Sequence, residues 1–164
     1  MSSNAPTRTR PDPDGIWRPD ATVATVVERG GRFLFVEERV RGRLVLNQPA
    51  GHLEPGESLV AAAVRETLEE TGWMVRPQAL VGIYQWTSPA DGAAFLRFTF
   101  CAEALRQLAD AVLDDGIERV LWLSRDELEA RGAQARSPLV ARGVDDWLAG
   151  RRLPLEALQC IADG

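Results

Sequence analysis

The 164-residue chain has the composition of an ordinary globular protein, with 45% hydrophobic and 26% charged residues, and is long enough for one domain with its own core. Its formal net charge of −5 argues against nonspecific binding to nucleic acid or anionic lipid. Two isolated cysteines form neither a zinc-ligand spacing nor a disulfide framework. Because the chain also lacks a long apolar run and the apolar core of a signal peptide, we expect a cytoplasmic protein.

The first fifty residues predict a tail followed by β-structure. Residues 1–19 contain four prolines and few apolar side chains, so they predict a flexible N-terminal tail, with a single domain over 20–164. Two β-rich runs flank Gly30 and Gly31, a pattern typical of a hairpin. The next run, LVLNQPAGHLEPGE, begins as a short strand and becomes a loop at its prolines and glycines.

A helix is predicted after this loop, from an N-cap at Ser58 to Thr71, with Gly72 at the position of a left-handed C-terminal cap. At about 100° per residue, one side of this helix is mainly apolar. That side consists of Val60, Val64, Thr67 and Leu68. The opposite side is therefore free for chemistry.

The second half of the chain alternates strands and helices. Strands are expected over 79–86 and 93–104, joined by the turn-rich TSPADG, and again over 118–123. In the second of these strands Phe95, Arg97 and Thr99 share one face, so a cation projects from the sheet surface. Ser124 then opens a helix with Glu127 at the capping-box spacing, and residues 137–150 predict a last helix.

Three glutamates lie together on the free side of the first predicted helix. Glu66, Glu69 and Glu70 occupy positions i, i+3 and i+4, where like charges repel each other. Considered alone, such acids usually form a solvated helix face. A carboxylate cluster of this kind is also what holds a hard divalent cation such as Mg²⁺.

The residues around the glutamates complete a longer motif. Gly51 is followed after five residues by Glu57, and after seven more by the run RETLEETG that begins at Arg65. This pattern resembles the box of the Nudix hydrolases, G-x5-E-x7-R-E-U-x-E-E-x-G-U, and all seven fixed positions match. The aliphatic U positions at Thr67 and Trp73 depart from it. Outer stretches such as YQWTSPADGAAFLRFTF, RSPLV and RRLPLEAL resemble the NudJ phosphatase subfamily, over roughly residues 20–158.

The resemblance implies an α/β protein with the Nudix fold, an α/β/α sandwich around a mixed β-sheet. It implies a metal site for Mg²⁺, with Mn²⁺ as a substitute, formed by Glu66, Glu69, Glu70 and the backbone carbonyl of Gly51. Among the catalytic residues, Glu57 and Arg65 are expected to form a supporting ion pair that orients the ligands. The general base is expected to be either Glu66 or Glu118, an acid of a later loop.

The subfamily further implies a small-molecule substrate and a monomer. Its members hydrolyse nucleoside tri- and diphosphates, and the pyrimidine diphosphate intermediate of thiamine synthesis, with release of orthophosphate. The alternatives are a Nudix enzyme that releases pyrophosphate or a nucleoside monophosphate, and a non-catalytic ligand-binding module, against which the complete glutamate set argues. Neither a nucleic-acid nor a membrane partner is indicated.

Four residues outside the box are candidates for substrate binding. Gln48 is placed to hydrogen-bond a base or phosphate, and Arg97 to bind phosphate as a bidentate donor. Trp86 and Phe95, with Tyr84 as a further candidate, are suited to stacking on a flat ring. For the aromatics, core or sheet-surface packing is the favoured alternative, and for Arg97 the alternative is an ordinary surface ion pair. No catalytic role is assigned to His52.

Overall fold

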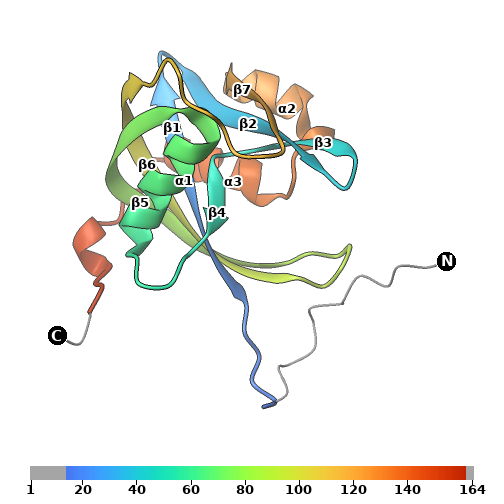
Figure 1. The fold of residues 1–164 in the computed structure, drawn as a ribbon, viewed down its shortest axis with the longest axis vertical. Coiled ribbons are helices and arrows are strands. Elements are labelled where there is room, and N and C mark those ends of the chain that lie inside the picture. Colours follow the sequence, from blue (N-terminus) through green and yellow to red (C-terminus); the bar gives the residue numbers. More distant parts are fainter. Residues whose placement is uncertain (1–13, 162–164) are drawn as a thin grey trace.

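The computed structural model describes residues 14–161 of the chain (Figure 1). Most of the expected tail, residues 1–13, lies outside this range, as do residues 162–164. Residues 14–19 form a turn and an irregular segment, and the first strand begins at Asp20, where the domain is expected to begin. The flexibility of the tail stays a prediction.

The strands of the described fold form one mixed sheet. Their bounds are β1 Asp20–Arg29, β2 Arg32–Val40, β3 Arg43–Asn47, β4 Ala50–His52, β5 Trp73–Thr87, β6 Ala94–Gln107 and β7 Ile117–Leu123. Within residues 14–161 the sheet has seven strands in the order β3-β2-β1-β6-β5, while β4 pairs with β1 and β7 pairs with β2. The pair β1–β6 is parallel and the other pairs are antiparallel, so the sheet is mixed as expected.

The predicted hairpin is confirmed, whereas β5 is longer than predicted. Gly30 and Gly31 join β1 to β2 with positive φ angles of 60° and 77°, which a glycine adopts without strain. Strand β5 begins at Trp73, directly after the first helix, and not near residue 79. The β5–β6 register shifts between Met74 and Val75 and again between Pro77 and Ala79. These bulges interrupt the two-residue alternation by which a strand is recognised.

Helices cover both faces of the sheet (Figure 1). Helix α1, Leu59–Thr71, packs on one face against a core cluster that includes Val23, Leu80 and Phe100. Helices α2, Arg125–Ala130, and α3, Leu139–Leu148, pack on the other around Phe35 and Val144. Two short 3₁₀ helices, Gly132–Gln134 and Leu155–Ala157, complete the described fold. The expected α/β/α sandwich is therefore confirmed.

The ends of α1 match their predicted caps. The Ser58 side chain accepts a hydrogen bond from the Ala61 N–H at 3.1 Å. Gly72 has φ 71°, and its N–H donates to the Leu68 carbonyl at 2.8 Å. Ser124 and Glu127 form the predicted capping box of α2. The start and end of α1 matter for function because they fix where its glutamates lie.

The structure contains no helix within residues 14–161 that is long and apolar enough to cross a membrane.

Candidate active site

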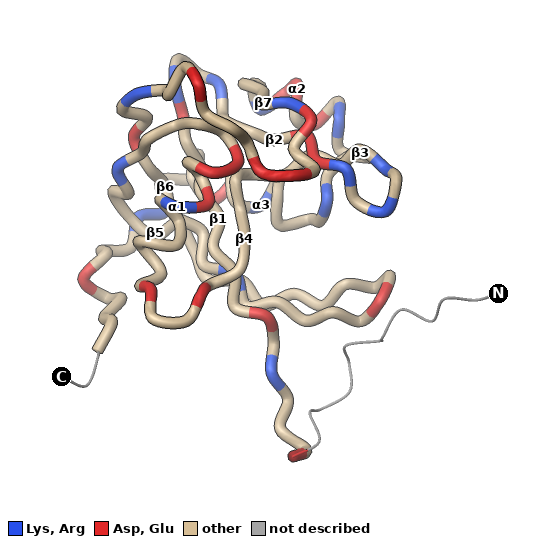
Figure 2. The backbone as a smooth tube through the Cα atoms, viewed as in Figure 1, with Lys and Arg blue, Asp and Glu red and all other residues tan. Residues whose placement is uncertain are grey.

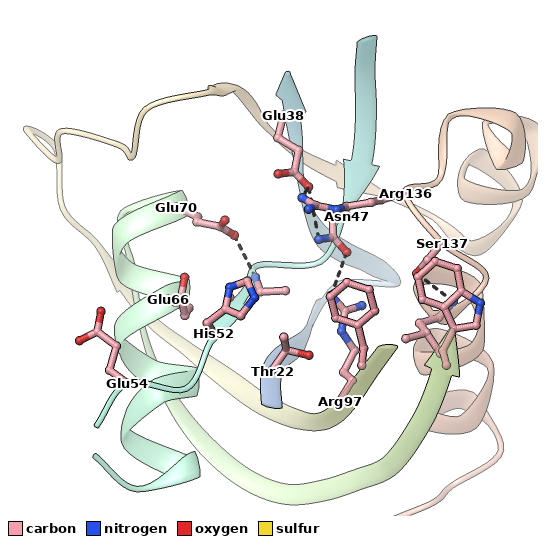
Figure 3. Close-up of a pocket in the computed structure, with 15 residues that line it drawn as sticks. Thr22, Glu38, Asn47, His52, Glu54, Glu66, Glu70, Arg97, Arg136 and Ser137 are labelled. Carbon is pink, nitrogen blue, oxygen red and sulfur yellow. Dashed lines mark hydrogen bonds and ion pairs between the residues drawn. The ribbon is translucent and has the colours of Figure 1, made fainter. Parts of the chain in front are cut away.

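A cleft of about 400 Å³ opens where α1 and β4 meet the β5–β6 hairpin and the segment before α3. Figure 3 shows Glu66 and Glu70 reaching into it from α1, with Arg97 and Arg136 across from them. Trp86 lies at the hairpin end of the same cleft. One cavity therefore joins an acidic wall, formed by Glu66 and Glu70, to a pair of arginines and an aromatic surface.

Arg65 links the loop before α1 to the glutamates of the helix. Its Nε and Nη2 donate to the two carboxylate oxygens of Glu57 at 3.0 and 2.6 Å, in a bidentate pair. Its Nη1 donates to Glu66 at 2.8 Å and to Glu69 at 3.0 Å, and Nη2 also reaches the His52 carbonyl at 3.1 Å. These hydrogen bonds raise the pKa of Arg65 and lower that of Glu57, so both groups stay charged.

The expected supporting ion pair is therefore formed, and it does more than join Glu57 to Arg65. One guanidinium fixes two of the three clustered glutamates as well as the loop. The simple i,i+4 pair between Arg65 and Glu69 is present too, at 3.0 Å, as one contact among several.

Gly51 lies directly against the Glu66 carboxylate. A Cβ atom built at Gly51 would overlap the carboxylate carbon and both oxygens of Glu66. The φ angle of Gly51 is not positive, so the glycine is required here by close approach and not by backbone conformation. Burial raises the pKa of Glu66, and the hydrogen bond from Arg65 lowers it in part.

Replacing Gly51 by alanine is expected to lower kcat/KM about 10- to 100-fold, because the added methyl group displaces the Glu66 carboxylate from its place. The melting temperature should change little, since Glu66 can swing away at the end of its side chain. Gly132→Ala is the matched control, because a Cβ there meets nothing within 4 Å. Equal activity of the Gly51 variant and the control would show that the close contact has no catalytic importance.

Glu70 is the most deeply buried carboxylate of the acidic wall, with 8% of the residue exposed. Its Oε2 accepts a hydrogen bond from the Ala50 N–H at 2.9 Å. Burial raises its pKa to about 8; the Ala50 hydrogen bond opposes this shift, and the charges of Glu38, Glu66 and Asp114 add to it. A buried carboxylate surrounded by other acids is a group that a bound cation would stabilise in its charged form.

Asp114 joins the acidic cluster from the β6–β7 connection. Oxygen atoms of Glu66, Glu69 and Asp114 all lie within 4.8 Å of one another. Figure 2 shows this acidic stretch passing next to the acidic positions of α1. The connection is held there by two backbone hydrogen bonds, from the Asp114 N–H to the Glu69 carbonyl at 3.1 Å and from Leu108 to Gly72 at 2.9 Å.

The structure does not bring Glu118 to this cluster. Glu118 lies within β7 and not in the preceding loop, and its carboxylate accepts a hydrogen bond from Arg39 Nε at 2.8 Å. It is absent from the residues that line the described cleft. The later-loop acid beside the α1 glutamates is Asp114, four residues earlier than the acid expected from the sequence.

Asp114→Asn is expected to lower kcat about 10- to 100-fold, because it removes one carboxylate from a cluster of three. Glu118→Gln is the paired comparison and should alter kcat less than about threefold, since an exposed ion pair with Arg39 contributes little. Steady-state kinetics of the two variants under the same conditions decides between the two acids. If Glu118→Gln instead lowers kcat more than Asp114→Asn does, Glu118 is the later acid that takes part in catalysis.

Arginine and amide side chains form the wall opposite the glutamates. Arg136 donates to Glu38 at 2.6 Å, and Asn47 donates to the same carboxylate at 3.4 Å. Arg97 Nη2 donates to Asn47 Oδ1 at 3.4 Å (Figure 3). Arg97 is therefore not the surface ion pair considered as its alternative, because only 9% of the residue is exposed and its contact is a neutral amide.

The aromatic candidates divide into two groups. Trp86 and Phe95 face each other across β5 and β6, stacked with ring centroids 5.7 Å apart, and both line the cleft. Tyr84 instead donates its hydroxyl to Asp146 of α3 at 2.8 Å. Gln48 also turns away from the cleft, since its Nε2 donates to the Val140 carbonyl at 2.6 Å and the residue is 1% exposed.

Gln48 and Tyr84 thus hold α3 on the sheet in the structure, and neither is among the residues that line the cleft. Asn47, one residue before Gln48, lines the cleft in its place. His52 lines the cleft too, with its imidazole 3.9 Å from the Asp20 carboxylate. Its backbone carbonyl accepts a hydrogen bond from Arg65.

The fold and the cleft together define a class of protein. Clustered carboxylates beside a glycine, faced by arginines, suit a hydrolase that acts on phosphate groups with a divalent cation. The model of the NUDIX domain matches residues 17–143 of the chain, which therefore belongs to the Nudix family and is a Nudix hydrolase. Nudix hydrolases generally use divalent metal ions, and the acidic cluster fits that requirement.

Named relatives are consistent with this family. The chain is 42% identical over 143 residues to Phosphatase NudJ of Escherichia coli K12, covering 87% of this chain and 92% of that protein. The figures are the same for Phosphatase NudJ of Shigella boydii serotype 4. A solved Nudix hydrolase from Nitrosomonas europaea matches with a TM-score of 0.86 and 48% identity, over 88% of this chain and 98% of that one.

Proposed function

We propose that this protein is a Mg²⁺-dependent phosphatase that hydrolyses the terminal phosphoanhydride bond of nucleoside tri- and diphosphates and releases orthophosphate. The observation that carries the proposal is the acidic cluster, in which oxygens of Glu66, Glu69 and Asp114 converge within 4.8 Å beside the cleft. Such a set of hard oxygen ligands suits Mg²⁺, and Mn²⁺ is the expected substitute.

The metal would be held by Glu66, Glu69 and Glu70, with the Gly51 carbonyl and Asp114 as further oxygen ligands. When bound, Mg²⁺ would supply positive charge to the phosphate oxygens and lower the pKa of water. The chemistry of these donors supports that assignment, because oxygens of three carboxylates lie within 4.8 Å of one another and Arg65 donates hydrogen bonds to only two of them, Glu66 and Glu69.

The protein's own groups would position the reacting atoms and take up the proton. Arg65 fixes Glu66 and Glu69 in place and so sets the geometry of the acidic cluster. Water adds its oxygen to the terminal phosphorus, the bond from that phosphorus to the bridging oxygen breaks, and the electron pair stays on the bridging oxygen. Glu66 or Asp114 accepts the proton that the water loses.

The substrate range is proposed from the relatives and the cleft together. The relatives from E. coli and Shigella are named phosphatases, and the stacked Trp86–Phe95 pair suits a flat ring. We extend the proposal to the pyrimidine diphosphate intermediate of thiamine synthesis, which combines a ring with a diphosphate. A monomer in the cytoplasm, without nucleic-acid or membrane partners, belongs to the same proposal.

Phosphate release from a nucleoside triphosphate, with Mg²⁺, with Mn²⁺ and with excess EDTA, tests the metal requirement. Orthophosphate should form with Mg²⁺, form more slowly or comparably with Mn²⁺, and not form with EDTA. Full turnover in EDTA would reject the metal dependence. Pyrophosphate in place of orthophosphate would keep the Nudix chemistry and reject the phosphatase assignment.

A further inference from the structure

Arg97 is a buried cation without a counter-ion in the structure. It is 9% exposed, its Nη2 donates a hydrogen bond to the neutral Asn47 side chain, and its Nη1 has no partner among the described residues. Burial lowers its pKa to about 10, so the guanidinium is still charged at neutral pH. Because a buried unpaired charge destabilises a fold, this position indicates an anion that the chain itself does not supply.

The charges around Arg97 are mixed, because Arg136 opposes its charge while Glu38 and Glu70 favour it without forming an ion pair with it in the described part of the chain. Arg136 lines the same cleft, and α3 begins beside it at Leu139 with no acidic residue in its first turn. The N-terminal end of a helix attracts anions through its dipole. The Thr22 hydroxyl, next to Arg97 across the sheet, is buried and likewise has no partner in the described part of the chain. Two buried polar groups without partners therefore stand at paired positions of β1 and β6, and both residues line the cleft.

The register of the strands gives the distances along the cleft. Arg97 pairs with Thr22, and Thr22 pairs with His52, which follows Gly51. Two strand spacings, about 10 Å, therefore separate the Arg97 backbone from the strand that covers the acidic wall. Phe95 lies two residues away along β6 on the same face, about 7 Å from Arg97. Its partner Trp86 lies on β5, one strand further from β4 than Arg97 is. The order along the cleft is acidic wall, Arg97, aromatic pair.

We infer that Arg97 binds the penultimate phosphate of the substrate, which is the leaving group of the reaction. The terminal phosphate then lies at the acidic wall, and the organic ring lies on the Trp86–Phe95 pair. This inference rests on the proposed function and adds to it an orientation and a role for Arg97. When the terminal P–O bond breaks, the electron pair left on the bridging oxygen adds negative charge to the phosphate that Arg97 holds.

This orientation selects both the substrate and the product that stays in the cleft. The substrate that fits this order best is a diphosphate, in which the penultimate phosphate is attached to a flat ring through a short linker. A triphosphate places one more phosphate between Arg97 and the aromatic pair. For a nucleoside diphosphate, the product left in the cleft is the nucleoside monophosphate, held by Arg97 through its phosphate. That product should therefore bind without metal, by a contact independent of the acidic wall.

Binding of cytidine monophosphate to the full-length protein in EDTA, followed by calorimetry, tests the inference. The wild-type protein should bind it at least about tenfold more tightly than cytidine, and Arg97→Gln should remove that difference. Arg97→Lys should retain part of it, because the charge remains and the bidentate geometry is lost. Arg76→Gln, at an exposed arginine paired with Glu103, is the control and should bind like the wild type.

Thermal unfolding without ligand separates ligand binding from a structural role. Arg97→Gln should be as stable as the wild type or more stable, because it removes a buried unpaired charge. A clear fall in its melting temperature, or equal binding of cytidine monophosphate by Arg97→Gln and the wild type, would overturn the inference. If the wild type releases orthophosphate with Mg²⁺ in that case, the proposed function still holds. Absence of any hydrolysis would instead refute the proposed function.

Discussion

Glu70→Gln is expected to lower kcat by about 10³-fold or more and, at the same time, to stabilise the metal-free protein at pH 8. Turnover should fall because glutamine is neutral and a far poorer ligand for Mg²⁺ than a carboxylate. The fold should persist, because the amide oxygen can still accept the hydrogen bond from the Ala50 N–H. Loss of activity with a gain in stability is typical of a functional residue whose burial lowers the stability of the fold.

The gain in stability follows from the pKa of Glu70. Burial raises this pKa to about 8 from an ordinary 4.5, so between these values the folded protein binds more protons than the unfolded chain. The stability of the metal-free wild type is therefore expected to fall as the pH rises from about 5 to 8. The loss is at most a few kcal/mol, since each pH unit in this window is worth about 1.4 kcal/mol.

Melting temperatures of the wild type and Glu70→Gln in EDTA, at pH 5 and pH 8, measure this contribution. The two proteins should differ little at pH 5, and the variant should be the more stable at pH 8. Mg²⁺ should raise the melting temperature of the wild type and not that of the variant. Glu129→Gln, at an exposed acid of α2, is the control. Full activity of Glu70→Gln would contradict the metal assignment.

Arg65→Met is expected to have the second largest effect, lowering kcat about 10²- to 10³-fold and the free energy of unfolding by about 2–3 kcal/mol. Its guanidinium contacts Glu57, Glu66, Glu69 and the His52 carbonyl, and methionine keeps the length of the side chain without any donor. In the variant the carboxylates of Glu57, Glu66 and Glu69 stay near each other without the guanidinium that pairs with them. Partial solvent exposure of Arg65 limits the loss of stability.

A double-mutant cycle with Glu57→Gln separates the two roles of Arg65. If the bidentate pair fixes the loop, Arg65→Met should lower the free energy of unfolding of Glu57→Gln by about 1–2 kcal/mol less than it lowers that of the wild type. Activity should be lower in Arg65→Met than in Glu57→Gln, because only Arg65 contacts Glu66 and Glu69. Fully additive stabilities, or normal activity of Arg65→Met, would contradict the orienting role.

Local sequence signals predict much of this fold. The glycine pair at residues 30 and 31, the caps Ser58 and Gly72 and the capping box at Ser124 each depend on a few neighbouring residues, and all are found where expected. The ion pair between Glu57 and Arg65 is found too, because the loop and the helix are adjacent in the chain. The start of β5 is missed, since its bulges hide the alternation of a strand.

The contacts made by distant segments are not predictable in this way. The sequence pattern gives α1 a solvent-facing acidic side, but β4 covers it, so Glu66 and Glu70 are buried. Asp114 reaches Glu66 only because backbone hydrogen bonds fix the β6–β7 connection to the end of α1.

The choice between Asn47 and Gln48 also depends on tertiary structure. The two side chains are neighbours in sequence, yet Asn47 lines the cleft and Gln48 bonds to α3. The register of β3 on β2 fixes the direction of Asn47 at the end of β3, and so which of the two neighbours faces the cleft.

The most direct test of the central claim is phosphorus NMR of the products formed from a nucleoside triphosphate in ¹⁸O-labelled water with Mg²⁺. Attack at the terminal phosphorus predicts orthophosphate that carries the label, together with an unlabelled nucleoside diphosphate. Labelled pyrophosphate, or a label in the nucleoside product, would place the attack at another phosphorus and contradict the account.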